Sequence, residues 1–302
     1  MTKFMPEGRN SEKTPFTVTM LNEAIEKQRI LEAKAVMCDS EHNLIVDLDG
    51  IKGIIPREQG AIGISEGHVR DIALISRVNK PVCFTVTKVT QENGRPVAIL
   101  SRLEAQKKCL DEYISQLKIG DIINARVTHL ENFGVFCDIG CGIVALMPID
   151  AISVSRISHP KDRFCSGEDI FAVVRAIDEN GRISLSHREL LGSWQQNADR
   201  FMQGQTVSGI IRTVEDYGVF VELTPNLAGL AELKSGVAPG QQASVYIKSI
   251  IPEKMKIKLI IIDSFDADYE PPEIEYYFNS NHIDSWRYSP ESCSKQIETC
   301  FI

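Results

Sequence analysis

Hydrophobic and polar residues alternate in two short stretches within residues 120–148, with a turn between them. In the second stretch the alternating residues are Val135, Phe136, Cys137, Asp138 and Ile139. A period of two places successive side chains on opposite faces of a β-strand. We therefore predict a hairpin with one face in a core and with the ring of Phe136 on the other face.

The same pattern returns 84 residues further along the chain. The landmarks Gly120, Phe133, Gly134 and Phe136 recur as Gly204, Tyr217, Gly218 and Phe220. A fixed offset at four positions indicates a tandem repeat. A third, degraded copy begins near residue 30, where strand-like stretches are separated by turns such as Asp49-Gly50.

Five short strands in about 70 residues suit a small Greek-key barrel of the OB type. We therefore predict an all-β protein of three tandem five-stranded OB-fold barrels, joined by short α-helices and followed by an acidic, aromatic C-terminal tail. The predicted segments are an N-terminal segment with a short helix (1–29), a degenerate first barrel (30–102), a helical linker (103–119), a second barrel (120–186), a second helical linker (187–203), a third barrel (204–263) and the tail (264–302).

The linkers repeat together with the barrels. Leu110, Ile114 and Leu117 have helical spacing, and the offset of 84 matches them with Trp194, Ala198 and Phe201. We predict helices over 103–118 and 187–202, and we interpret Trp194 as a packing residue between helix and barrel. His187, at the start of the second helix, has no evident partner.

The net charge of −8 argues against a strongly basic nucleic-acid binder. The tail alone holds eight acidic and two basic residues, which leaves the rest of the chain close to balanced. That body can bind a phosphate backbone through a local stripe of basic residues, with modest and salt-sensitive affinity. The tail also carries the aromatic residues Tyr269, Tyr276, Tyr277, Phe278, Trp286 and Tyr288. The sequence leaves open whether this tail docks on the third barrel or on a partner.

Several classes of protein are disfavoured by what the sequence lacks. No apolar run approaches the roughly 20 residues that span a bilayer, and the N-terminus lacks the hydrophobic region of a secretory signal; we expect a cytoplasmic protein. The eight cysteines contain no Cys-x-x-Cys pair, so we expect no metal site. No phosphate-binding loop or nucleophile elbow is recognisable, so we expect no catalysis, no cofactor and no small-molecule substrate.

Residues 120–186 and 204–263 resemble the RNA-binding domain of ribosomal protein S-one. The residues that carry the resemblance are Gly120, Phe133-Gly134-Val135-Phe136, Gly140, Ala145-Leu146, Gly167, Ile177-Asp178 and Arg182-Ile183-Ser184-Leu185-Ser186. The resemblance extends more weakly to the first barrel through Gly53-Ile54-Ile55-Pro56. The layout of three repeats is similar to that of short bacterial homologues of ribosomal protein S-one.

Exposed aromatic rings on the open face of an OB barrel can stack unpaired bases. The hairpin places Phe133 and Phe136 on its open side, and Tyr217 and Phe220 are their matches in the third barrel. Each of these residues, taken alone, would more often lie in a core, but their repetition around a glycine favours surface stacking. The resemblance adds Asp178 and Arg182 on the last hairpin of the second barrel, and Lys256 at the position that matches Arg182.

The first barrel departs from this pattern. An alignment of Pro56 with Pro148 places Glu41 and Leu44 at the positions of Phe133 and Phe136, so that both stacking residues are missing. In this respect the first barrel resembles the N-terminal repeats of large family members, which dock on the ribosome through protein.

We therefore expect a protein that binds single-stranded RNA or mRNA with loose sequence preference through its second and third barrels, in translation at the small ribosomal subunit. Proteins of that subunit are expected as further partners. The alternative is a protein-interaction scaffold or ribosome-associated adaptor that acts through the first barrel and the acidic tail. A more remote possibility is an accessory subunit of RNA degradation, because the same domain recurs in ribonucleases.

Overall fold

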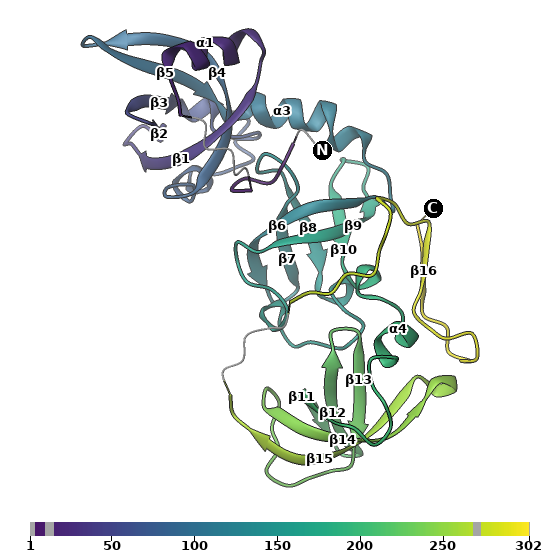
Figure 1. Ribbon diagram of the computed structural model, residues 1–302. Coiled ribbons are helices and arrows are strands. Elements are labelled where there is room, and N and C mark those ends of the chain that lie inside the picture. The colour runs from purple at the N-terminus through teal and green to yellow at the C-terminus, as the bar shows by residue number, and fades with distance from the viewer. Residues whose placement is uncertain (1–3, 10–14, 268–272, 302) are drawn as a thin grey trace. The chain divides into compact units, whose positions relative to one another are not determined.

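The computed structural model describes residues 4–9, 15–267 and 273–301. Its strands form three closed five-stranded barrels, which confirms the predicted all-β fold (Figure 1). Two compact units divide the chain, one built on residues up to Leu117 and the other on most residues from Lys118 onward. Two stretches of the second barrel, Asn124–Arg126 and Asp138–Val144, belong to the first unit. The boundaries of our seven segments stay predictions.

The first barrel has the strand order β1-β2-β3-β5-β4, in which β3 and β5 run parallel and the other neighbours antiparallel. The helix α1 (Val18–Glu26) precedes it, α2 (Ile72–Ile75) lies within it, and α3 (Arg102–Glu112) follows it. Thr17 begins α1 by accepting a hydrogen bond from the backbone N–H of Met20, which satisfies one free donor of the first turn. The strands are β1 (Ile30–Cys38), β2 (Leu44–Leu48), β3 (Ile51–Ile55), β4 (Pro81–Glu92) and β5 (Arg95–Ser101).

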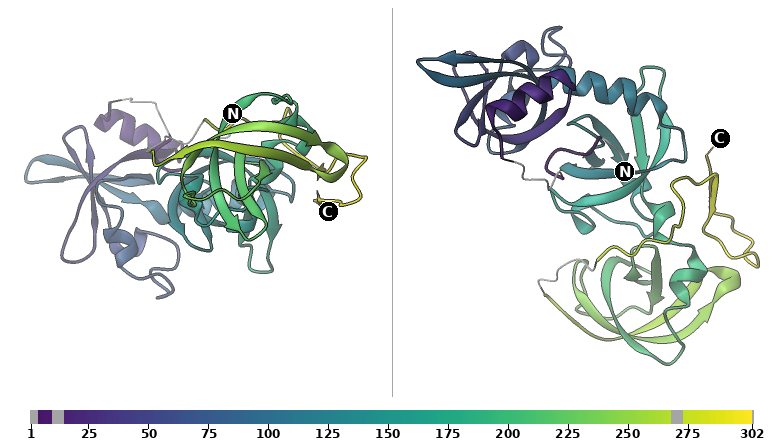
Figure 2. Two further views of the ribbon diagram at one scale, coloured as in Figure 1. Left: turned by 90° about the horizontal axis from the view of Figure 1, so that it is seen from below. Right: turned by 45° about the horizontal axis from the view of Figure 1, so that its top comes forward.

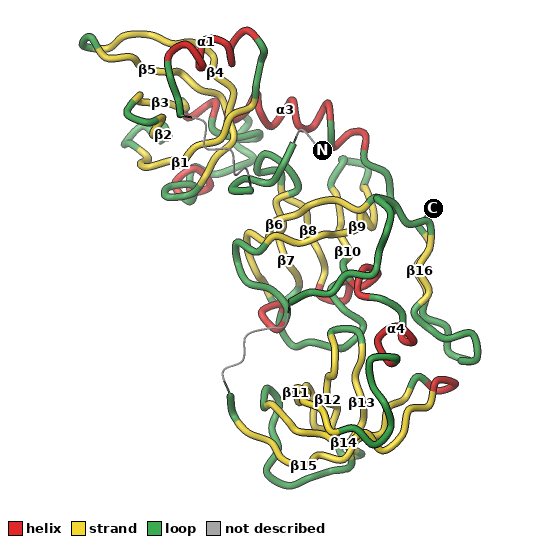
Figure 3. The backbone as a smooth tube through the Cα atoms, viewed as in Figure 1, coloured by secondary structure: helices red, strands yellow, loops and turns green. Residues whose placement is uncertain are grey.

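The second and third barrels are closed sheets with the orders β10-β8-β7-β6-β9 and β11-β12-β13-β15-β14. Buried and more exposed residues alternate over parts of these strands, and Figure 3 shows how little helix accompanies them. The strands of the second barrel are β6 (Ile122–Glu131), β7 (Gly134–Asp138), β8 (Val144–Pro148), β9 (Asp169–Ile177) and β10 (Ile183–Ser186). Those of the third are β11 (Thr206–Glu215), β12 (Gly218–Thr224), β13 (Leu227–Ala231), β14 (Gln242–Ile251) and β15 (Lys256–Phe265).

Short 3₁₀ segments lie between these helices and strands. They lie at Arg57–Gln59, Ile114–Gln116, Ile149–Ala151, Pro160–Asp162, Arg188–Leu191 and Pro252–Lys254.

The linker helices are shorter than the sequence predicts. The first, α3, ends at Glu112 because Tyr113 leaves the helical region of the backbone (φ −129°, ψ −61°). The prediction of one continuous helix over 187–202 is wrong, since a 3₁₀ turn is followed by the five-residue helix α4 (Trp194–Ala198). Gly192 lies between them with φ +82° and ψ 166°, a backbone conformation that ends a helix and that glycine adopts without steric cost.

Trp194 occupies the predicted packing position. Its side chain is 1% exposed and belongs to the core of the third barrel, together with Val219 and Ile257. The short helix α4 therefore carries a large apolar anchor into that barrel.

The described part of the tail, 273–301, packs against both the second and the third barrel (Figure 2). The ring of Tyr276 meets Phe171 of β9 edge to face, with ring centroids 5.3 Å apart. The backbone carbonyl of Tyr288 accepts a hydrogen bond of 2.9 Å from the N–H of Trp194. The tail ends in a two-stranded hairpin of β16 (Ser285–Arg287) and β17 (Glu298–Cys300). Tyr269, another predicted aromatic of the tail, lies outside the described residues.

His187 has two partners that the sequence did not reveal, because both are brought by long-range contacts. Its Nδ1 lies 3.3 Å from the carbonyl oxygen of Ile152, and its Nε2 lies 3.3 Å from the hydroxyl of Tyr276. A carbonyl only accepts, so the neutral ring carries its proton on Nδ1 and Nε2 accepts from the tyrosine. Burial disfavours the imidazolium ion and lowers the pKa of His187 to about 4.

Replacing Trp194 with alanine should lower the free energy of unfolding by about 3–5 kcal/mol, because it leaves a cavity in the core of the third barrel. Urea unfolding followed by circular dichroism measures this loss. Met202→Ala, at a side chain 65% exposed beyond α4, is the control and should change stability by less than about 0.5 kcal/mol. A loss below about 1 kcal/mol for Trp194→Ala would contradict the assigned packing role.

The free energy of unfolding should fall as the pH drops from about 6.5 to about 4. In the unfolded chain His187 binds a proton near pH 6.5, whereas burial in the native state lowers its pKa to about 4. The unfolded state therefore holds more protons in this window, and up to about 3 kcal/mol of stability is lost as the pH falls through it. Urea unfolding at a series of pH values should give a flatter profile for His187→Gln than for the native protein. The same substitution at the exposed His129 is the control, and equal slopes for the His187 variant and the native protein would refute this account.

Candidate nucleic-acid interface

An aromatic pair stands on the outer face of the second barrel. Phe133 lies in the turn before β7 and is 56% exposed, and Phe136 is half-buried within β7. Their ring centroids are 6.0 Å apart and the ring planes meet at 88°. A Cβ atom on Gly134 would lie 2.4 Å from the carbonyl oxygen of Met147, so only glycine allows β7 and β8 to approach here.

The third barrel repeats this arrangement with the same geometry. Tyr217 is 70% exposed, and its ring meets that of Phe220 with centroids 6.0 Å apart and an angle of 88°. A Cβ atom on Gly218 would lie 2.5 Å from the carbonyl oxygen of Ala231. The sequence pattern of an aromatic residue, a glycine and a second aromatic therefore produces one shape twice.

His129 on β6 extends the aromatic pair of the second barrel. Its ring stacks on Phe136 with centroids 6.4 Å apart and an angle of 26°, and its Nε2 lies 2.7 Å from a carboxylate oxygen of Glu131. His129 is not among the site residues predicted from the sequence. Its match in the third barrel, Thr213, pairs with Phe220 between β11 and β12.

The remaining predicted residues lie on the last hairpin of each barrel. In the second barrel, a carboxylate oxygen of Asp178 accepts hydrogen bonds from the backbone N–H groups of Asn180 (2.9 Å) and Arg182 (2.8 Å). Asp178 thus closes the turn that carries the exposed side chain of Arg182. No ring contact or hydrogen bond among the described residues joins this turn to Phe133 or Phe136.

Lys256 begins β15 and is exposed on the same face of that strand as Lys258. The strand pairing places Lys258 opposite Leu230, which in turn lies opposite Phe220. The third barrel therefore presents basic side chains on the same outer surface as its aromatic pair.

The alignment of the first barrel needs a correction of one residue. Met37 pairs with Ile45, and Ile45 pairs with Ile54 on the next strand. In the third barrel, Thr213 pairs in the same way with Phe220, and Phe220 pairs with Leu230. The counterpart of Phe220 is therefore Ile45, whereas Leu44 is fully buried in the core. The hairpin of β2 and β3 differs in length by one residue from the corresponding hairpin of the third barrel. No single sequence offset therefore aligns both strands with their counterparts. The first barrel still has no aromatic ring at this position.

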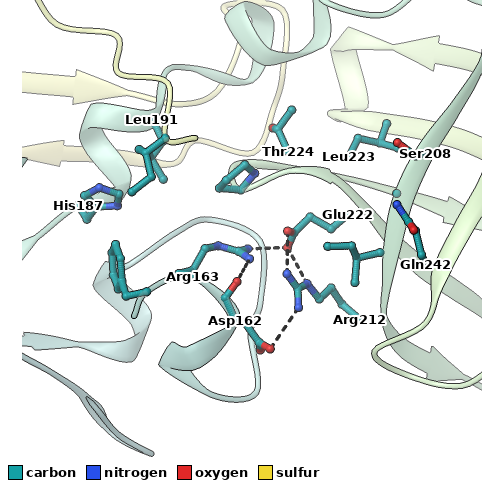
Figure 4. Close-up of a pocket in the computed structure, with 15 residues that line it drawn as sticks. Asp162, Arg163, His187, Leu191, Ser208, Arg212, Glu222, Leu223, Thr224 and Gln242 are labelled. Carbon is teal, nitrogen blue, oxygen red and sulfur yellow. Dashed lines mark hydrogen bonds and ion pairs between the residues drawn. The ribbon is translucent and has the colours of Figure 1, made fainter. Parts of the chain in front are cut away.

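A cavity of about 240 Å³ lies between the loop that follows β8 and the third barrel (Figure 4). Arg163 donates to a carboxylate oxygen of Glu222 at 2.5 Å, and Arg212 pairs with both oxygens of Glu222 at 3.0 Å. Arg212 also lies 3.3 Å from Asp162. Burial lowers the pKa of Arg163, while Glu222 opposes this shift. These four charges pair with one another, although the buried Nε of Arg163 has no hydrogen-bond partner. We interpret them as a structural cluster.

Other kinds of site are absent from the described residues in two respects. No group of three or more histidine, cysteine, aspartate or glutamate side chains in 4–9, 15–267 and 273–301 is arranged to hold a metal ion. Within the same residues, no helix is long and apolar enough to cross a membrane.

Residues 116–188 match the family model of the S1 RNA binding domain, a range that contains all five strands of the second barrel. The small ribosomal subunit protein bS1 of Leuconostoc lactis is 30% identical over 247 residues, which cover 77% of this chain and 55% of the relative. The bS1 protein of Staphylococcus aureus is 26% identical over 269 residues, which cover 84% of this chain and 66% of the relative. The aligned part of the chain thus spans between half and two thirds of the length of these relatives.

A crystal structure of a multidomain protein with nucleic acid binding domains from Streptococcus pneumoniae covers 79% of this chain and 75% of its own, at 16% identity and a TM-score of 0.26. The likeness to the S1 RNA binding domain therefore rests on the sequence comparisons. The chain thus carries an S1 RNA binding domain at residues 116–188 and is similar to bS1 proteins over most of its length.

Proposed function

We propose that this protein binds single-stranded RNA, with loose sequence preference, through the aromatic pairs of its second and third barrels. The observation that carries the proposal is the repeated pair of rings, Phe133 with Phe136 and Tyr217 with Phe220, each with one ring largely exposed. Stacking on such rings contributes about 1–3 kcal/mol per base and tolerates any base, because every base has a π-face.

Basic residues on the same two barrels supply the attraction to phosphate. Arg182 is exposed on the last hairpin of the second barrel, and Lys256 and Lys258 are exposed on β15 of the third. The guanidinium plane of Arg182 can pair with a phosphate or stack on a base. Asp178 has a positioning role, since it closes the turn that presents Arg182.

The setting that we propose is translation, with mRNA held at the small ribosomal subunit. This follows from the relationship to bS1, which is named as a protein of that subunit. The first barrel would contact protein rather than RNA. Residues paired across its neighbouring strands at the position of the stacking rings are all aliphatic: Met37, Ile45, Ile54 and Ile99. The side chain of Met37 is 51% exposed.

The rival role as an adaptor that acts through its acidic tail is less well supported. Tyr276 and Phe278 of the tail pack on Phe171 of the second barrel, and Tyr288 is buried against the third. These rings are engaged within the chain and so are not free to anchor a partner.

The double variant Phe136→Ala plus Phe220→Ala should bind a single-stranded RNA at least tenfold more weakly than the native chain, because each substitution removes one ring from a stacking platform. Titration of a fluorescein-labelled oligouridylate in a gel-shift assay measures the change. The control variant, Ile45→Ala plus Ile54→Ala, trims the corresponding face of the first barrel and should leave affinity within about twofold. Native affinity in the aromatic double variant would refute the site assignment.

A further inference from the structure

A second cavity, of about 230 Å³, opens directly beside the aromatic pair of the third barrel. One wall is formed by Arg212, Thr213, Tyr217 and Phe220 of that barrel. Ser155 and Arg156, which belong to the long loop of the second barrel, also line the cavity. The stacking surface of the third barrel is therefore only one part of the lining of a partly open cavity.

We propose that the RNA site of the third barrel is composite and takes one unpaired nucleotide. The base lies against Tyr217 and Phe220, and its sugar and phosphate meet Ser155 and Arg156 of the preceding barrel. This inference rests on the proposed function and deepens it, because it assigns a binding role to a loop that lies outside the predicted site.

Two polar groups in the wall lack partners, and both suit a nucleotide. The hydroxyl of Ser155 is buried and has no hydrogen-bond partner. A buried hydroxyl without a partner carries a desolvation cost that a ligand oxygen removes. Arg156 is exposed, and no ion pair or hydrogen bond occupies its guanidinium group among the described residues. It provides the cation that a phosphate requires.

The other charges at the cavity fix where the phosphate lies. The guanidinium group of Arg212 is already neutralised by Glu222 and Asp162. Glu215, on the rim formed by β11, repels an anion. The phosphate therefore lies on the side of Arg156, and the base lies toward the rings.

The loop that carries Ser155 and Arg156 is held in place by the third barrel. The N–H of Val154 donates to the side-chain oxygen of Asn226 at 2.9 Å, and the N–H of Ser155 donates to the carbonyl of Pro225 at 3.4 Å. Further along the same loop, Arg163 forms its buried ion pair with Glu222. Anchors on both sides of Arg156 hold the wall before RNA arrives, which reduces the ordering cost of binding.

The volume of the cavity limits the ligand to one nucleotide. Pockets that enclose drug-sized molecules measure roughly 300–1,000 Å³, and this cavity is smaller than that range. One base with part of its sugar fits, while the neighbouring nucleotides follow the open face of the barrel.

The test uses the full chain with Phe136→Ala, which removes a stacking ring from the second barrel and makes the third barrel the main site. In this background Arg156→Ala should weaken binding of a labelled oligouridylate about tenfold. It should also reduce the slope of log K against log salt by about 0.7, the value for one phosphate contact on a single strand. Ser155→Ala should weaken binding about threefold at an unchanged salt slope.

Lys161→Ala is the matched control, because it removes the same charge from an exposed position of the same loop that does not line the cavity. It should change affinity less than twofold. If Arg156→Ala equals this control while Tyr217→Ala still weakens binding, the composite site is refuted and the proposed function stands. If Tyr217→Ala also leaves affinity unchanged, RNA binding by the third barrel itself is refuted.

Discussion

A buried cluster of four charges connects the loop of the second barrel to the third barrel. Glu222 is almost fully buried and accepts hydrogen bonds from both Arg163 and Arg212. A carboxylate removed from water to this degree is tolerated only when its oxygens are fully paired. Arg163 comes from the loop, whereas Glu222 and Arg212 belong to the third barrel. The cost of leaving any of these charges unpaired therefore holds the loop in place, and with it the wall that faces Tyr217.

Local periodicity accounts for most of the barrels and for the aromatic pairs. Alternation with a period of two is enforced by a closed sheet, where each residue faces either the core or the outside. It therefore indicated correctly that Val135 lies inside and Phe136 outside. The glycine between the two rings also has a clear structural reason. At Gly134 and Gly218 the backbone of the next strand lies too close to leave room for a side chain. Trp194 could be assigned to packing because its helical spacing repeats that of Leu110.

Two of the features that sequence reasoning missed depend on contacts between distant residues. The partner of His187 that comes from the tail, Tyr276, is 89 residues away, and the contact of Val154 with Asn226 spans 72 residues. No local pattern records such pairs. The error at Leu44 has a different origin, since one residue of length in a hairpin moves a strand to its opposite face. The break of the second linker at Gly192 shows that helical spacing alone does not determine where a helix is continuous.

Positive and negative charges are nearly balanced outside the tail, which limits how strongly the second and third barrels attract RNA. A chain with few excess cations gains little from the release of counterions, so stacking must supply most of the affinity. One pair of rings provides only a few kcal/mol. Two pairs on one chain add their contributions when a single RNA reaches both, because the second contact forms at a high effective concentration. In the proposed mode of binding, the repetition of the hairpin makes weak, sequence-tolerant contacts sufficient, and the wall beside Tyr217 makes the second of these contacts stronger than an open face alone would allow.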